Sequence, residues 1–105
     1  MFNGTGEYRW KSGAYFYGSF VNGIRKGEGI WISNSVSENA DIYKGSYENN
    51  KKNGYGVYKW ANGTIYDGYF KNDLRHDEGI MVFPNGKAAK FIWKDGVKTT
   101  KLYCE

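Results

Sequence analysis

Few side chains in this sequence could carry out catalysis. The chain of 105 residues holds one histidine, His76, and one cysteine, Cys104, which lie far apart in the sequence. His76 falls in a short polar connection, where an exposed loop residue is the ordinary case. A nucleophile needs an adjacent base and a third group that orients it, and no spacing here supplies such a set. The sequence therefore predicts a protein that is not an enzyme.

Metal and phosphate sites are also poorly supported by the residue types. A zinc site needs more His and Cys ligands than the chain has, which leaves only carboxylate ligands for a metal. Asp73, Asp77 and Glu78 lie close in sequence, but a charged hairpin tip is the ordinary explanation for such a group. The repeated Gly-x-Gly pairs precede no helix and lack the Gly-Lys-Ser/Thr ending of a phosphate-binding loop. We expect neither a metal nor a cofactor.

The composition is that of one small globular domain. Hydrophobic residues make up 40% and aromatic residues 19% of the chain, which excludes a disordered protein. The mean hydropathy of −0.73 and the short apolar runs argue against a membrane span. The first residues have neither the basic nor the apolar segment of a signal peptide, and a single cysteine fits a reducing compartment. We therefore expect a cytoplasmic protein.

The chain repeats itself. Aromatic-x-Gly-x-aromatic occurs at 16–20, 43–47 and 66–70, and each copy is followed by a Gly-x-Gly pair or its Asp-x-Gly variant. The first step is 27 residues and the second is 23, so four extra residues lie in the polar stretch from Ser33 to Asp41. Partial copies stand at both ends. The single domain, 1–105, accordingly divides into a half repeat at 4–13, repeats at about 14–40, 41–63 and 64–86, and a degenerate repeat at 87–105.

The spacing of aromatic residues and glycines predicts a β-sheet. Aromatic and β-branched residues at alternate positions, bounded by Asn-Gly turns, are typical of strands. Side chains alternate between faces, so 14 of the 20 aromatic residues fall on one face together with ten glycines. Each glycine leaves a gap that a ring from the neighbouring strand can cover. The other face is predicted to be largely solvated, relieved by Val57, Ile80 and Val82.

We therefore predict an all-β fold, a single-layer twisted antiparallel meander of about nine short strands in which each repeat is a hairpin. Gly4 to Trp10 should form the first strand, with a free hydrogen-bonding edge to which a strand of another protein or of a second copy could add.

The pattern Y-x-G-x-F/Y followed by G-x-G, at a step of 23 residues, resembles the MORN repeat (membrane occupation and recognition nexus). The resemblance extends from Gly4 to about Gly96 and departs from the pattern at Asp77, at the four-residue insertion and in the last copy. It implies a non-enzymatic scaffold. Proteins of this family serve in cytoskeletal assemblies, including cilia, flagella and radial spoke heads, at membrane junctions, and as accessory modules of lipid kinases and other enzymes. We expect a protein-interaction subunit of a cytoskeletal, ciliary or flagellar axonemal assembly.

The aromatic face is the first candidate binding surface. Tyr and Trp are enriched at binding hot spots, and a large exposed aromatic strip usually marks an interface. We expect it to bind a protein segment, although rings that only cover glycines would show the same pattern. The candidate residues are Tyr8, Trp10, Phe16, Phe20, Trp31, Tyr43, Tyr47, Tyr58, Trp60, Tyr66, Phe70 and Trp93.

A basic edge is the second candidate surface. The loops of one type should line up along one edge of the meander and bring together Arg25, Lys26, Lys51, Lys52, Lys71 and Arg75. This edge could serve only for solubility, contact an acidic protein, or contact anionic lipid. Lipid contact defines the alternative function, a peripheral phospholipid-binding or membrane-tethering module. Nucleic acid is disfavoured, because rings committed to packing over glycine do not stack on bases.

Overall fold

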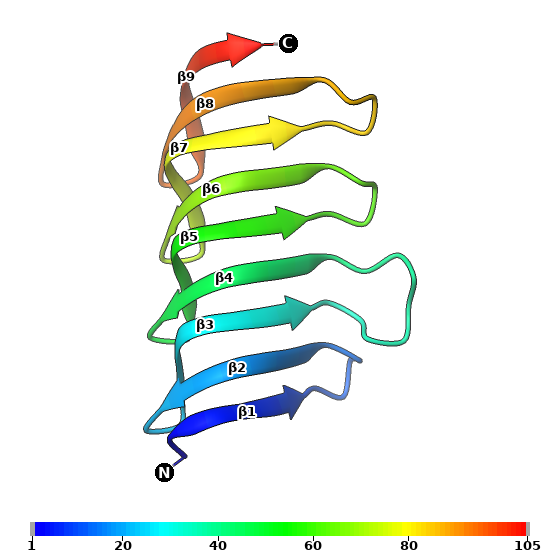
Figure 1. The fold of residues 1–105 in the computed structure, drawn as a ribbon, viewed down its shortest axis with the longest axis vertical. Helices are drawn as coiled ribbons and strands as arrows, with labels where there is room; N and C mark the ends of the chain where they lie inside the picture. Colours follow the sequence, from blue (N-terminus) through cyan, green and yellow to red (C-terminus); the bar gives the residue numbers. More distant parts are fainter. Residues whose placement is uncertain (1, 105) are drawn as a thin grey trace.

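The computed structural model describes residues 2–104, with side chains up to Lys98 (Figure 1). These residues form one antiparallel sheet in which every strand pairs with its neighbours along the chain. The strands are β1 (Gly4–Arg9), β2 (Tyr15–Val21), β3 (Ile24–Ile32), β4 (Ile42–Glu48), β5 (Lys51–Lys59), β6 (Ile65–Lys71), β7 (Leu74–Val82), β8 (Ala88–Lys94) and β9 (Val97–Cys104). The predicted single-layer meander is thus confirmed. The described chain contains no helical segment that could span a membrane.

The two irregular parts of the repeat pattern leave the sheet intact. The extra residues form the long loop between β3 and β4, which Figure 1 shows projecting beyond the other loops. Two hydrogen bonds close its base: the amide of Ser33 donates to the carbonyl of Asp41 (2.9 Å), and the amide of Asp41 donates to Ser33 Oγ (2.9 Å). The eroded last copy still forms a hairpin, because β9 pairs with β8. Glu105, at the end of the predicted degenerate repeat, lies outside the described residues.

Two-residue turns connect the strands at one edge of the sheet. The turn residues are Asn22-Gly23, Asn49-Asn50, Asn72-Asp73 and Asp95-Gly96, and their φ angles lie between 48° and 83°. Positive φ at both central positions defines the type I′ turn, whose backbone matches the right-handed twist of the flanking strands. Asn, Asp and Gly are the residues that adopt this conformation at little cost. The local sequence at each turn therefore sets the hairpin register.

A row of glycines crosses the sheet from β1 to β7. The paired strands place these residues opposite one another, in the order Gly6, Gly18, Gly29, Gly45, Gly56, Gly68 and Gly79. In the central hairpin, a Cβ at Gly56 would lie 2.5 Å from Cε1 of Tyr43, closer than side chains tolerate. Phe16 occupies the same place over Gly29, and Tyr66 over Gly79. At these three positions a ring therefore takes up the space of a side chain. At Gly18, Gly45 and Gly68 the atoms closest to an added Cβ belong to the backbone of the paired strand.

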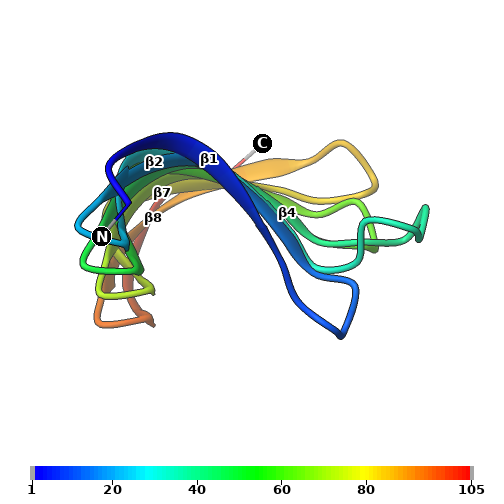
Figure 2. The same ribbon diagram turned by 90° about the horizontal axis from the view of Figure 1, so that it is seen from below.

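The strands bend at this glycine row. Phe16 and Phe20 flank Gly18 four residues apart, which in a straight strand is about 13 Å. Their ring centroids are nevertheless only 5.4 Å apart, in an edge-to-face contact. The corresponding rings of Tyr43 and Tyr47 are 5.3 Å apart. The sheet is consequently arched, as Figure 2 shows. The rings lie on the concave side, because rings four residues apart converge there.

The bend allows a single layer to bury its own core. Among residues 2–98, nine side chains are buried although no second layer covers them, and all of them lie on the concave side of the arch. Phe16, Tyr43 and Tyr66 have no exposed surface. Tyr43 donates its hydroxyl to the carbonyl of Ser46 (2.8 Å), and Tyr66 donates to that of Tyr69 (2.9 Å), so both buried hydroxyls have partners. Each buried ring contributes about 1.5–3 kcal/mol to the free energy of unfolding.

Gly29→Ala tests the contact between ring and glycine. The new methyl group would occupy the space of the Phe16 ring, so we expect the free energy of unfolding to fall by about 2–3 kcal/mol. In a Phe16→Leu background the same substitution should cost at least about 1 kcal/mol less, since the smaller side chain leaves room for the methyl group. Urea denaturation of the four proteins gives the coupling energy. Equal costs in both backgrounds would show that the ring is not the constraint.

Candidate protein-binding face

The structure divides the twelve predicted aromatic residues by exposure. Six are buried and form the core: Phe16, Tyr43, Tyr47, Tyr66, Phe70 and Trp93. Five are partly buried and pack against that core: Trp10, Phe20, Trp31, Tyr58 and Trp60. Tyr8, near the end of β1, is 53% exposed. Only the second group and Tyr8 offer ring surface to a partner, because the first group is already covered.

The six predicted basic residues also occupy two environments. Lys26, Lys51 and Lys71 are exposed at the hairpin tips. The other three, Arg25, Lys52 and Arg75, are half-buried and lie over rings of the concave face. The guanidinium carbon of Arg25 is 5.3 Å from the ring centroid of Tyr47. Lys52 Nζ is 5.7 Å from that of Tyr43, and the guanidinium carbon of Arg75 is 4.1 Å from that of Trp93. These distances are within the range of cation–π attraction.

A β-bulge explains the position of these three cations. In the first full hairpin Gly18 pairs with Gly29, but Phe20 pairs with Arg25, so two extra residues of β3 lie between the two pairs. Gly27 lies in the bulge with φ of +96°. Gly54 and Asp77 occupy the equivalent places in the next two repeats. Aspartate is one of the few residue types other than glycine that accept a positive φ, as Asp77 does here. The bulge thus moves one cation per repeat beside the second ring of the motif.

The cations differ in their polar partners. Arg25 donates from Nη2 to the carbonyl of Asn50 (2.9 Å). Lys52 Nζ lies 3.4 Å from Asp73 Oδ1. Within residues 2–98, no carboxylate forms an ion pair with Arg75. Burial lowers the pKa of Arg75 from its usual value, so a carboxylate brought to this side chain would meet a partly desolvated cation.

Hollows between these rings and cations follow one another along the concave face. The first, about 160 Å³, lies between Tyr8, Trp10 and Arg25. The second, about 200 Å³, lies between Trp31 and Lys52. A third of about 240 Å³ is lined by residues including Tyr58, Trp60, Phe70 and Arg75. We call these three hollows the concave groove. Successive repeats are two strands apart, so the hollows are spaced by about 10 Å.

The repeats are joined through the hairpin tips beside the groove. The amide of Asn50 donates to the carbonyl of Arg25 (3.1 Å), and that of Asp73 donates to the carbonyl of Lys52 (2.9 Å). Gly96 makes the same bond to Arg75 (2.8 Å). Each repeat therefore holds the backbone of the preceding cation in place, which fixes the positions of the hollows relative to one another.

His76, expected in an exposed connection, lies in strand β7 and is partly buried. His76 Nδ1 accepts a long hydrogen bond (3.5 Å) from the amide of Asp95, where Asn53 Oδ1 accepts one from the amide of Asn72 in the preceding repeat (3.3 Å). The acidic residues near it are not gathered: Asp73 pairs with Lys52, whereas Glu78 pairs with Lys90 (3.3 Å). No group of three or more His, Cys, Asp or Glu side chains suited to a metal occurs in the described part of the chain.

Buried tyrosines should make the protein sensitive to alkaline pH. Burial raises the pKa of Tyr66 to about 12 and also raises the pKa values of Tyr43, Tyr47 and Tyr58. The unfolded chain ionises near pH 10, so it binds fewer protons than the folded chain above that pH. Stability is therefore fully present below about pH 10 and is lost as the pH rises towards 12.

Tyr66→Phe tests this dependence in urea titrations between pH 7 and 11.5. At pH 7 we expect a loss of about 1 kcal/mol, because the hydrogen bond to the Tyr69 carbonyl is removed. Above pH 10 the stability of the variant should fall less steeply than that of the wild type, by up to about 1.4 kcal/mol per pH unit. Parallel curves would show that Tyr66 ionises equally easily in both states.

Arg75→Met tests the cation over the rings. The variant keeps most of the apolar stem but loses the charge above Trp93, so we expect the free energy of unfolding to fall by about 1–2 kcal/mol. Lys26→Met is the matched control, since this exposed lysine contacts Glu48 at 3.5 Å and such surface pairs contribute little. Urea denaturation measures both. Equal losses in the two variants would contradict a stabilising role for the buried cation.

Comparison with known proteins identifies the repeat. The family model of the MORN repeat matches the chain four times, at residues 1–15, 16–35, 43–65 and 66–88. A search of curated protein sequences finds no significant match. Members of this family are repeat modules that act as scaffolds or in interactions and are in general not catalytic. The four matches cover more than half of the sequence, and the hairpins of the structure repeat with the same step. The chain therefore belongs to the MORN repeat family.

Proposed function

We propose that the chain is a non-enzymatic scaffold subunit of a cytoskeletal, ciliary or flagellar axonemal assembly, and that it binds a protein segment along the concave groove. The observation that carries the proposal is the groove itself, in which accessible rings and at least one cation recur in each hollow. A groove that repeats every 10 Å or so is suited to an elongated polymer rather than to one small molecule.

The lining of the groove indicates the chemistry of the bound segment. Accessible Trp and Tyr rings supply the apolar surface that hot spots use. Arg75, whose charge has no carboxylate partner among residues 2–98, favours an acidic side chain at the third hollow. The Lys52–Asp73 pair lines both the second and the third hollow. Arg25 adds a positive charge to the second hollow in the same way that Arg75 does to the third. We therefore expect a segment that combines apolar and acidic side chains.

The free edge of β1 offers a second contact within the same assembly. β1 ends the described sheet and pairs only with β2. A hollow of about 480 Å³ lies beside it, lined by Phe2, Gly6, Tyr8 and Phe20 among others. A partner strand that pairs with this edge could insert a side chain there. This contact would link the chain to its neighbours while the groove holds the bound segment.

The rival proposal of lipid binding has fewer freely exposed cations to support it. Three of the six basic residues predicted at one edge, Arg25, Lys52 and Arg75, are half-buried and also lie over rings. Lys26 contacts Glu48. Lys51 and Lys71 remain as exposed tip cations, and at about 1 kcal/mol each near an anionic membrane they supply weak attachment.

Extraction of native cells that express tagged chain separates the two proposals. We expect the wild type to stay with the insoluble cytoskeleton after mild detergent and moderate salt, because docking on rings depends little on ionic strength. Arg75→Glu should move most of the chain into the soluble fraction, since it places a like charge against an acidic segment. Lys71→Glu, which changes the charge of an exposed tip, should leave the chain insoluble.

The controls address folding and the lipid alternative. Thermal unfolding of both purified variants shows whether Arg75→Glu keeps the fold, and Trp60→Ala provides a second groove variant without a charge change. Release of the wild type by detergent alone would overturn the proposal. Release by Lys71→Glu and not by the groove variants would favour attachment through the hairpin tips.

A further inference from the structure

The convex face carries an apolar surface that lies outside the groove. Its side chains come from two neighbouring rows on the arm of the sheet between the glycine row and the loops. Strand register places the first row as Tyr17, Ile30, Lys44, Val57, Asp67, Ile80 and Lys90. The second row is Tyr15, Ile32, Ile42, Lys59, Ile65, Val82 and Ala88. We call them the convex rows.

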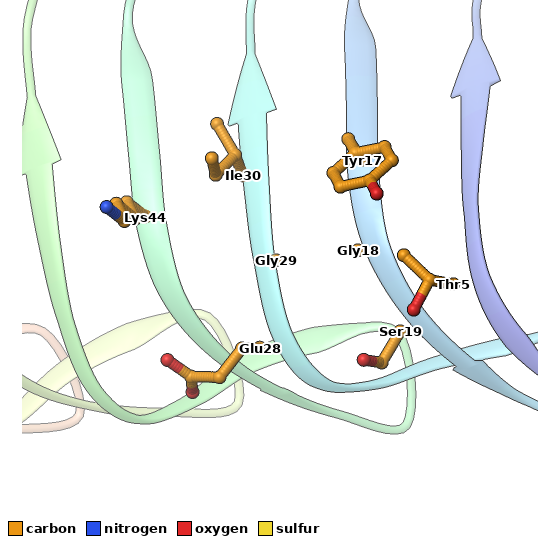
Figure 3. A pocket seen from close by; sticks show the side chains of 8 residues that line it. All are labelled: Thr5, Tyr17, Gly18, Ser19, Glu28, Gly29, Ile30 and Lys44. Carbon is orange, nitrogen blue, oxygen red and sulfur yellow. The ribbon is translucent and has the colours of Figure 1, made fainter.

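Figure 3 shows the beginning of the first row from outside the sheet. Tyr17, Ile30 and Lys44 lie side by side on one side of the glycine positions, and Ser19 and Glu28 lie on the other. Together with the bare backbone between them, these side chains line a hollow of about 220 Å³. The apolar side chains thus stand on one arm of the arch, whereas the arm beyond the glycines begins with polar ones.

This surface departs from the largely solvated face that the sequence predicted. Tyr17 is 47% exposed, Ile80 40% and Ile42 37%. β-Propensity alone favours branched residues equally on both arms. In the corresponding row on the other arm, residues such as Ser19, Glu28 and Ser46 are polar. Tyr55 and Tyr69 of that row are about half exposed, but each also presents a polar hydroxyl. A strip of aliphatic side chains concentrated on one arm indicates a surface that a partner covers.

The charged residues of the convex rows could pair with one another between two copies of the chain. In the first row Lys44 of β4 and Asp67 of β6 flank Val57 of β5. A two-fold axis in the interface and parallel to β5 would place Lys44 of each copy against Asp67 of the other. It would also place Ile30 against Ile80. In the second row, Ile42 would meet Ile65 by the same operation.

We propose that the convex rows form the interface of a two-fold symmetric dimer in which two sheets pack back to back. Face-to-face sheets lie about 10 Å apart with strands within about 30° of each other, so the central strands β3 to β7 make the contact. Lys59 would meet its own copy at the axis. It is exposed in the row next to the loops, and its long side chain reaches water past the edge of the sheet.

The dimensions of the chain determine the size of such an interface. The molecule measures 45 × 28 × 17 Å. Strands β3 to β7, spaced by about 4.8 Å, span about 24 Å of the longest dimension, and the rows cover about half of the next. This corresponds to about 350 Å² per copy, the size of a weak interface rather than of a standard one with roughly 800 Å² per partner. On the arm that carries the convex rows, the strands run to the loops without a second sharp bend and fan out with the sheet twist (Figure 2), so the central strands of two copies can lie against each other. Both concave grooves would then face outward.

Analytical ultracentrifugation of the full chain tests the dimer through reciprocal charges. We expect the wild type to sediment as a dimer and both Lys44→Asp and Asp67→Lys to raise the dissociation constant by about tenfold or more, because each places like charges across the axis. An equimolar mixture of the two variants should recover a dimer, since the two substituted side chains then face each other with opposite charges, as do the two native ones. A surface contacted by another protein predicts no such recovery.

Three controls accompany the measurement. Lys51→Asp makes the same charge change at an exposed hairpin tip and should leave the dimer intact. Tyr55→Phe removes the hydrogen bond that Tyr55 donates to Asp67 Oδ1 (2.5 Å). It therefore shows how much of the change in dissociation constant caused by Asp67→Lys comes from losing this hydrogen bond. Ile80→Lys disrupts the rows without reversing a pair. A monomeric wild type, a dimer that neither charge reversal weakens, or a mixture that stays monomeric would each overturn the proposal.

Discussion

The close contact between aromatic rings and a glycine backbone is the constraint on which the rest of the structure depends. A side chain at Gly56 would lie 2.5 Å from the ring of Tyr43, so the strand passes under the ring only because that side chain is absent. The same contact lets each strand bend, and the bend brings the rings before and after the glycine to within about 5 Å of each other. One layer thereby forms a core that ordinarily needs two.

This core also determines what the surfaces can do. Rings that cover glycines are buried, so binding on the concave side falls to the rings at the strand ends, such as Trp31 and Trp60, and to the cations beside them. The convex side has none of these rings, and its largely aliphatic rows stay accessible. The two faces are therefore chemically distinct, which allows one to hold a partner segment while the other packs against a second copy.

The sequence was sufficient to predict the strands, their order and the face that holds the rings, because all three follow from local periodicity and turn residues. It did not reveal that Arg25, Lys52 and Arg75 lie over rings. Their spacing of four residues before Gly29, Gly56 and Gly79 was a usable signal for the face, but only the bulge moves them next to Phe20, Tyr47 and Phe70. The convex rows were missed because they appear only when the strands are aligned in register.

The proton chemical shifts of the glycine α-hydrogens test the central claim most directly. Hydrogens held under an aromatic ring resonate upfield, so NMR should show upfield α-hydrogens at Gly29, Gly56 and Gly79, with nuclear Overhauser effects to Phe16, Tyr43 and Tyr66, respectively. The turn glycines Gly63 and Gly86 supply the reference, because no aromatic ring lies within 4 Å of the Cβ position at either one. Ordinary shifts and no ring contacts at the three row glycines would contradict a core built on ring and backbone.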